Sequence, residues 1–128
     1  MRVLLDTHTF IWWDSEPAKL SPNALMLCQN QANTVLLSVA SVWEMQIKLQ
    51  LGKLKLNLPL AEVIESQQRT NNIEILPVSL KHVLALESLP THHKDPFDRL
   101  LIAQANVEGA VLVSRDSVFA SHPVKVVW

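Results

Sequence analysis

Five carboxylate residues lie where the sequence pattern places the end of a strand or the start of a helix. They are Asp6, Glu44, Asp95, Asp98 and Asp116, drawn from the 12 acidic residues of the chain. If the fold gathers them, their negative charges repel one another and destabilise the folded state, unless a hard cation takes the carboxylate oxygens as ligands. This placement predicts a site for a divalent metal ion.

A carboxylate site that holds Mg²⁺ or Mn²⁺ supports the hydrolysis of a phosphodiester bond. The metal neutralises the phosphate and activates a bound water, so few other residue types are needed. No Ser–His–acid or Cys–His arrangement is indicated, and no pair of histidines has zinc-ligand spacing with a third ligand. Cys28 is the lone cysteine and is expected in the core, whereas His92 and His93 are expected in an exposed loop.

Each acid also has a structural explanation. The segment Ser41–Glu44 matches a capping box, and the segment Asp95–Asp98 matches an N-cap followed by proline and an acid in the first helical turn. Asp6 could form an Asx-type turn, and Asp116 could cap a short helix. Four independent caps need not lie beside one edge of a sheet, whereas a metal site requires it.

The elements that must position these acids follow from the apolar pattern. Apolar runs alternate with helical patterns from end to end, which is typical of βα units on a mostly parallel sheet. Strands are predicted at residues 2–6, 34–38, 73–78, 110–114 and 124–127. Helices are predicted at residues 9–13, 21–31, 40–51, 59–70, 79–88, 96–108 and 116–120. We expect residues 1–128 to form a single domain.

Ligands of open parallel sheets bind beyond the carboxyl ends of the strands, where the strand order reverses. Asp6 and Asp116 follow the two strands expected to flank that point, and Glu44 falls early in the helix after the second strand. Asp98 joins them only if the start of its helix lies at the same edge of the sheet.

Composition excludes several classes of protein. The chain has only two glycines, too few for the phosphate-binding loops of P-loop or dinucleotide-binding proteins. A net charge of -1 argues against binding nucleic acid through bulk electrostatics, although Lys48, Lys53, Lys55, Arg99 and Arg115 leave open either a cationic rim or ordinary solvated side chains. Neither a membrane span nor a signal peptide is indicated, so a soluble cytoplasmic protein is expected.

Several segments carry a resemblance to a known family. They are Leu4–His8 running into Trp12–Trp13, Ser38–Glu44 followed by Leu51–Leu54, Asp95–Ala105, and Ser114–Asp116. In this order and at these separations, they resemble the PIN-domain ribonucleases, and within that family the VapC-like toxins of bacterial toxin–antitoxin pairs.

The resemblance implies an α/β fold, a three-layer α/β/α sandwich whose five-stranded, mostly parallel sheet has the strand order 3-2-1-4-5. It also implies endoribonuclease activity that depends on Mg²⁺ or Mn²⁺. Asp6, Glu44 and Asp98 match the acidic triad of the family, and Asp116 matches its more variable fourth acid, so all four are candidate catalytic residues and metal ligands. Asp95 is either a ligand or only a helix cap. The hydroxyl groups of Thr7 and Ser114 could orient the carboxylate oxygens that bind the metal.

Family members usually dimerise and are held inactive by a small antitoxin, so the resemblance implies an RNA substrate, a cognate antitoxin and a homodimer. The cluster Phe10–Trp13 and an apolar face with Leu49, Leu51 and Leu54 are candidate contact surfaces, although core packing explains Phe10 equally well.

Two other classes compete with this interpretation. One is a non-catalytic PIN-like module that binds RNA or protein, and the complete set of acids speaks against it. The other is a receiver domain, which expects paired acids near the first strand and a lysine beyond a late strand. Asp6 has no adjacent acid, and Lys125 lies within the last predicted strand.

Overall fold

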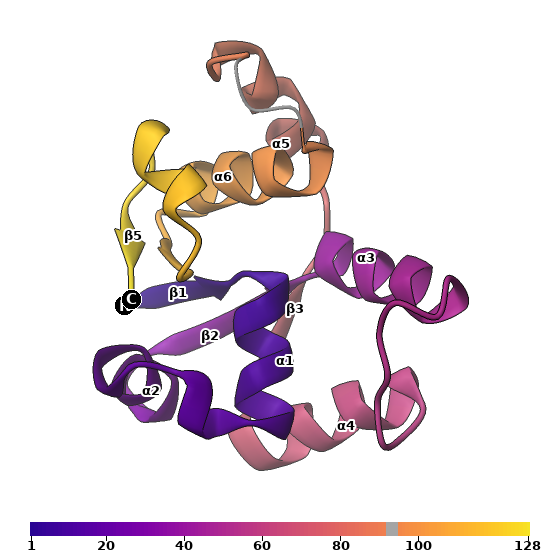
Figure 1. Cartoon of the computed structure of the whole chain (residues 1–128). Coiled ribbons are helices and arrows are strands. Elements are labelled where there is room, and N and C mark those ends of the chain that lie inside the picture. Colours follow the sequence, from indigo (N-terminus) through magenta and orange to yellow (C-terminus); the bar gives the residue numbers. More distant parts are fainter. Residues whose placement is uncertain (92–94) are drawn as a thin grey trace.

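The structure, a computed structural model, describes residues 1–91 and 95–128. The expected placement of His92 and His93 in an exposed loop falls outside these residues. Five parallel strands form one sheet in the order β3-β2-β1-β4-β5, which confirms the predicted fold (Figure 1). The strands are β1 (Arg2–Leu5), β2 (Thr34–Ser38), β3 (Glu74–Leu76), β4 (Val111–Val113) and β5 (Val126–Val127).

Strand β1 is the centre of the sheet and pairs with both β2 and β4. Leu5, its last residue, pairs with Leu37 on one side and with Val113 on the other, so the three strands end almost level. The strand order reverses between β1 and β4. The edge beyond Leu5 is therefore the place where a ligand of such a sheet binds.

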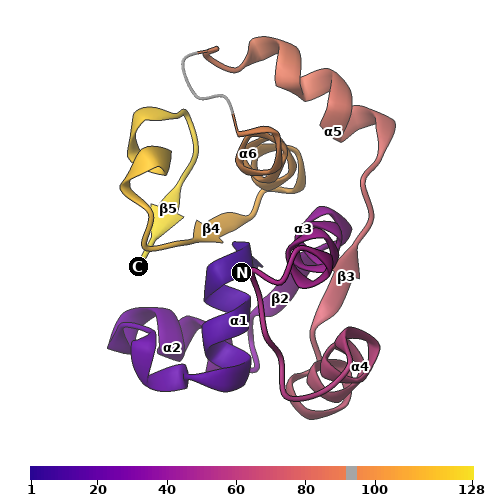
Figure 2. The ribbon, with the colours of Figure 1, turned by 45° about the vertical axis from the view of Figure 1, so that its right-hand side comes forward.

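Helices cover both faces of the sheet. Figures 1 and 2 show α1, α2 and α4 on one face and α5 and α6 on the other, while α3 leaves the end of β2 and contacts both α1 and α6. No helix in residues 1–91 or 95–128 has the length and apolar character needed to cross a membrane. The helices are α1 (Thr7–Ser15), α2 (Pro22–Gln29), α3 (Val39–Gln50), α4 (Leu60–Asn71), α5 (Leu80–Ala85) and α6 (Pro96–Glu108), with 3₁₀ turns at η1 (Pro17–Lys19), η2 (Leu86–Ser88) and η3 (Ser117–Ser121).

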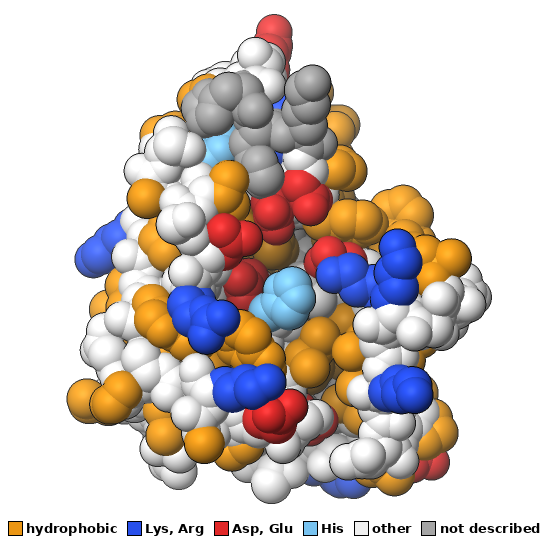
Figure 3. All heavy atoms as spheres, in the orientation of Figure 1, with side chains coloured by type: hydrophobic (Ala, Val, Ile, Leu, Met, Phe, Trp, Pro, Cys, Tyr) orange, Lys and Arg blue, Asp and Glu red, His pale blue; other side chains and the backbone are white. Residues whose placement is uncertain are grey.

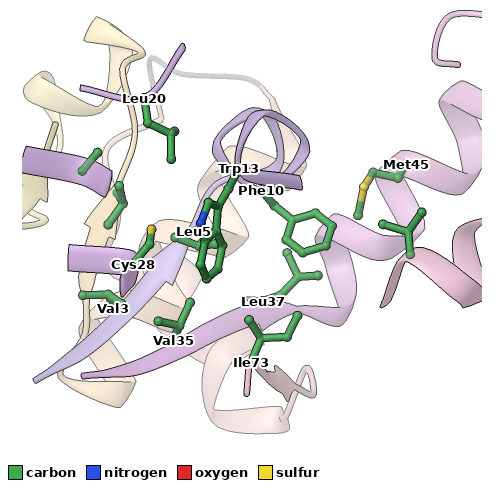
Figure 4. Packing of buried hydrophobic residues seen from close by; sticks show 13 residues of the cluster. Val3, Leu5, Phe10, Trp13, Leu20, Cys28, Val35, Leu37, Met45 and Ile73 are labelled. Atoms are coloured by element: carbon green, nitrogen blue, oxygen red, sulfur yellow. The ribbon is translucent and has the colours of Figure 1, made fainter. Parts of the chain in front are cut away.

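The two cores follow from the alternation of side chains along β1. Val3 and Leu5 point to one face, where they pack with Phe10 and Trp13 of α1 (Figure 4). Leu4 points to the other face and packs in a cluster with residues of α6. Because both faces are buried, the strands are apolar except for polar or charged residues at the ends of β1, β2 and β3, as expected for a parallel sheet.

Among the described elements, β2 and α6 have their predicted bounds, and three differences in the other elements bear on the site or on the competing interpretations. Helix α1 begins at Thr7 directly after the strand, two residues earlier than expected, because Asp6 caps it. The helix predicted at 79–88 is a short α5 followed by a 3₁₀ turn. Strand β5 begins at Val126, so Lys125 precedes the strand instead of lying in it.

Candidate active site

Asp6 is the most deeply buried of the candidate acids. It is only 7% exposed, and each of its carboxylate oxygens accepts a hydrogen bond. The backbone N–H of Thr9 donates to Oδ1 at 2.7 Å, and the hydroxyl of Ser114 donates to Oδ2 at 2.5 Å. Asp6 is therefore the N-cap of α1 instead of the Asx-type turn expected from the sequence, and one carboxylate joins the ends of β1 and β4.

Ser114 connects Asp6 to Asp116. Besides donating to Asp6, its hydroxyl oxygen accepts the backbone N–H of Asp116 at 3.0 Å. The Asp116 carboxylate in turn accepts the N–H of Val118 at 3.1 Å, so it caps the 3₁₀ turn η3 as the sequence indicated. Asp116 is exposed, whereas Ser114 is buried.

Glu44 is held by a side chain from another element. The hydroxyl of Thr7 donates to its Oε1 at 2.6 Å, and the Nζ atom of Lys48 lies 3.2 Å from its Oε2. The capping box expected from Ser41 to Glu44 is wrong, because Ser38 caps α3 with its own hydroxyl and Glu44 therefore falls on the second turn. Its carboxylate serves the cluster at the strand ends, not the helix terminus.

Asp95 and Asp98 occupy the start of α6. The Oδ1 atom of Asp95 accepts the backbone N–H of Phe97 at 2.9 Å and that of Asp98 at 3.2 Å, which confirms its expected cap. Phe97 packs edge to face on Trp43 of α3, with ring centroids 5.4 Å apart. Since Trp43 precedes Glu44, this contact brings the first turn of α6 to the same edge of the sheet as the other acids.

A cavity of about 340 Å³ opens beside Asp6 and Asp116, and His8, Trp12 and Arg115 complete its lining. Figure 3 shows several acidic side chains gathered in the middle of this face, with Lys and Arg side chains around them. A cationic rim around an acidic centre, left open by the sequence, is therefore present, with Lys48 paired to Glu44 and Arg115 in the cavity wall.

A larger cavity of about 520 Å³ lies at the opposite edge, where β2 and β3 begin. Amide side chains dominate its lining, and Glu74 is the one carboxylate among the residues that form it. Its size does not make it the functional site, because none of the candidate acids reaches it.

The sequence patterns did not single out His8 or Trp12 as residues of the site. Both belong to α1, four positions apart, and so lie on one face of that helix next to its capping residue Asp6. The sequence could have indicated these two residues only through their positions in a helix that follows Asp6. That spacing becomes informative once the helix is known to begin at Thr7.

The candidate acids of the described residues do not form a complete metal site by themselves. Among the residues that the structure describes, no three carboxylate, imidazole or thiol groups lie close enough to hold a metal ion directly. Asp6 and Glu44 are each oriented by a hydroxyl, and the set as a whole offers only oxygen atoms, the donors that Mg²⁺ and Mn²⁺ prefer. Magnesium commonly keeps several waters and takes one or two carboxylates, so these donors fit such an ion.

The parallel sheet in the order 3-2-1-4-5, with carboxylates beyond its central strands, defines an α/β protein of the PIN class. A family model described as PIN domain matches residues 3–125, and the chain belongs to this family. It is 28% identical to "Ribonuclease VapC22" of Mycobacterium tuberculosis over 121 residues, which cover 94% of this chain and 91% of that protein.

Solved structures show the same fold. VapBC2 from Rickettsia felis, bound to a DNA fragment from its promoter, has a TM-score of 0.73 at 20% identity and covers 99% of this chain and 98% of its own. VapBC-5 from Mycobacterium tuberculosis has a TM-score of 0.62 at 18% identity, with coverage of 98% and 95%. FitAcB from Neisseria gonorrhoeae has a TM-score of 0.58 at 24% identity, with coverage of 98% and 96%.

Proposed function

We propose that the chain is an endoribonuclease that hydrolyses RNA phosphodiester bonds with the help of Mg²⁺ or Mn²⁺. The observation that carries this proposal is the support of two carboxylates from different elements by hydroxyls at one sheet edge: Ser114 holds Asp6, and Thr7 holds Glu44. Membership of the PIN family and the likeness to a VapC ribonuclease support the same chemistry.

Asp6, Glu44, Asp98 and Asp116 are the residues that would hold the metal. Asp6 is suited to direct ligation, because its orientation is fixed by two hydrogen bonds while each oxygen keeps acceptor capacity. When bound, the ion neutralises the phosphate charge and activates water for attack on phosphorus. Glu44 either ligates or accepts a proton from that water, and Asp116 supplies an exposed carboxylate at the mouth of the cavity.

The chain acts, in this proposal, as the toxin of a toxin–antitoxin pair in the cytoplasm. The similar chains from Rickettsia felis and Mycobacterium tuberculosis come from VapBC structures, and the second is described as a member of a toxin–antitoxin family. A cognate antitoxin is therefore the expected protein partner, and a homodimer is the expected assembly. Trp43, 63% exposed, and Leu51, 62% exposed, leave apolar surface for such contacts.

Expression of wild type, Asp6→Asn and Asp98→Asn tests the proposal. The wild type should arrest growth and fragment cellular RNA, and the purified chain should cut single-stranded RNA only with Mg²⁺ or Mn²⁺ added. Both variants should lose activity by at least about a hundredfold, since each removes a charged ligand. Asparagine still caps a helix, so Asp6→Asn keeps the hydrogen bond that starts α1.

Glu74→Gln is the matched control, because it exchanges a carboxylate for an amide at the opposite edge of the sheet. It should cleave RNA as the wild type does. Equal toxicity and equal cleavage by all four proteins would contradict the catalytic assignment, and RNA binding without cleavage by the wild type would favour a non-catalytic module.

A further inference from the structure

We propose that Trp12, His8 and Arg115 form a subsite that binds one nucleotide of the RNA next to the bond that is cut, with the base against the aromatic rings and the phosphate on the guanidinium. This inference rests on the proposed ribonuclease function and names the residues of the chain that receive its substrate. All three line the cavity that also contains Asp6 and Asp116.

The aromatic side of this subsite is built on one face of α1. The rings of His8 and Trp12 lie 5.8 Å apart and are tilted by 38°. Trp128 packs edge to face on Trp12 with centroids 6.1 Å apart, and this contact restrains the indole of Trp12. Trp12 is half-buried against the core, while His8 is exposed. A rigid, partly exposed ring beside a phosphodiesterase site is suited to stacking a base, because every base offers a π-face.

Arg115 supplies the charge that the acidic cavity lacks. Asp6 and Asp116 repel a phosphate group, and the net charge of -1 gives the chain no bulk attraction for RNA. The Cζ atom of Arg115 lies over the Trp12 ring, 4.9 Å from its centroid. A guanidinium in this position has N–H groups that can donate to a phosphate, while the exposed His8 ring beside Trp12 offers a further aromatic surface for the base.

The Arg115 side chain forms no ion pair with the residues that the structure describes, although two acids lie in the same cavity. Its backbone is fixed by its neighbours, because the Ser114 hydroxyl bonds both to Asp6 and to the N–H of Asp116. The backbone from which this side chain extends is thereby held next to the proposed catalytic carboxylate of Asp6.

The size of the cavity agrees with one nucleotide. Its volume of about 340 Å³ falls at the lower end of the range, about 300 to 1,000 Å³, found for small-ligand sites. Lys19 also approaches the Trp12 ring, with its Nζ atom 5.8 Å from the centroid, but it pairs with Glu16 at 3.2 Å. Arg115 is therefore the cation that the subsite offers to a phosphate.

Kinetics of the purified chain on a fluorescein-labelled single-stranded RNA of roughly ten nucleotides test the subsite. Arg115→Ala should raise KM about tenfold with little change in kcat, and should make the slope of log affinity against log salt shallower by about 0.7. Arg115→Lys should restore the salt slope. Lys125→Ala, which removes an exposed cation ahead of β5, should change neither quantity.

Abasic substitutions separate stacking from a merely structural role of Trp12. Moving one abasic nucleotide along the RNA should weaken wild-type cleavage at least about fivefold at one position next to the cut. On intact RNA, Trp12→Leu should reduce cleavage by the same factor. On RNA that is abasic at that position, Trp12→Leu should cause no further reduction, because the substitution and the missing base remove the same contact. Trp12→Phe, which keeps an aromatic ring, should recover part of the loss.

Three outcomes overturn the subsite. One is unchanged KM in the Trp12 and Arg115 variants while Asp6→Asn is inactive, which leaves the proposed function intact. Another is an equal loss on intact and abasic RNA, which marks Trp12 as structural. The third is loss of antitoxin binding with RNA affinity retained, which assigns the surface to a protein. If the wild type cuts no RNA, the proposed function has failed. RNA binding by the same variants, measured as the fluorescence anisotropy of the labelled RNA, then tests the subsite by itself.

Discussion

The hydroxyl of Ser114 donates a 2.5 Å hydrogen bond to Oδ2 of Asp6, across 108 positions of sequence. The bond holds the carboxylate at the point where the strand order reverses, and together with the N–H of Thr9 it restrains the side chain that caps α1. The orientation of the proposed metal ligand therefore depends on a side chain that no local sequence pattern connects to it.

Ser114→Ala should lower metal-dependent cleavage about 10- to 100-fold and raise the metal concentration needed for half-maximal activity. The variant removes the donor to Asp6 without removing a ligand, so metal titration of the cleavage rate is the measurement. Ser88→Ala, which removes an exposed hydroxyl bonded to the carbonyl of Ala85 at the end of α5, is the control and should behave as wild type. Full activity of Ser114→Ala at low metal would show that the orientation of Asp6 is maintained without this bond.

Lys48→Met should tighten metal binding. The ammonium group of Lys48 lies 3.2 Å from Oε2 of Glu44 and competes with a cation for that oxygen. Its removal should lower the metal concentration for half-maximal cleavage severalfold. The free energy of unfolding should change by no more than about 1 kcal/mol, as for other i,i+4 pairs on a helix, since both side chains of this pair are partly buried. Lys53→Met, an exposed lysine beyond the end of α3, is the matched control. Weaker metal binding by Lys48→Met would mean that the pair positions Glu44 instead of competing for it.

Millimolar Mg²⁺ or Mn²⁺ should raise the melting temperature of the wild type, because an ion that binds only the native state stabilises it. The acids repel one another without a cation, so the shift should shrink in Asp6→Asn and persist in Glu74→Gln. Differential scanning fluorimetry across a metal titration measures it. No shift in the wild type would indicate a site that is completed only when RNA binds.

Glu108→Ala should destabilise the fold more than Arg2→Ala does. Glu108 accepts a bond from the buried ring of His82 at 2.9 Å and pairs with the exposed Arg2 at the same distance. The Nδ1 atom of His82 already accepts the N–H of Ser79, so Nε2 is the donor to Glu108 and would be buried without a partner. We expect a loss of about 1 to 3 kcal/mol in urea unfolding for Glu108→Ala and less than about 1 kcal/mol for Arg2→Ala. Equal losses would place the effect in the surface pair.

Cys28 should resist thiol reagents until the protein unfolds. Burial among the core residues raises the pKa of its thiol from 9.0 to about 12, so almost no thiolate exists in the native state near neutral pH. The unfolded state ionises first, so the contribution of Cys28 to stability is complete below pH 9.0 and is lost as the pH rises toward 12. The loss should reach at most about 1.4 kcal/mol per pH unit and should be absent in Cys28→Ala. Rapid labelling of the native protein at pH 8 would contradict this burial.

The succession of strands and helices along the chain could be predicted from the sequence, because apolar runs and helical spacing are local signals. The helix over 96–108 and the strand over 34–38 were predicted at their observed bounds. The cap at Asp95 was predicted for the same reason, since an N-cap and its partners lie within three residues. The strand order itself came from the resemblance to a family.

One local pattern of the sequence gave a wrong prediction. Ser41 and Glu44 have the spacing of a capping box, yet Ser38 at the end of β2 caps the helix and leaves Ser41 buried within it. The contact that holds Glu44 comes instead from Thr7, 37 positions away, and only the three-dimensional fold creates it. The position of Asp98 at the shared edge likewise depended on how α6 packs against α3, which spacing alone does not encode.

The bond between Asp6 and Ser114 also bears on the order in which the protein is made. The ribosome makes the capping carboxylate 108 residues before its hydroxyl partner, and Asp116 follows that partner. A nascent chain that stops before β4 has β1 and Glu44 but lacks the strand that completes the central sheet. The site that we propose is therefore assembled only after β4 has been made and has paired with β1.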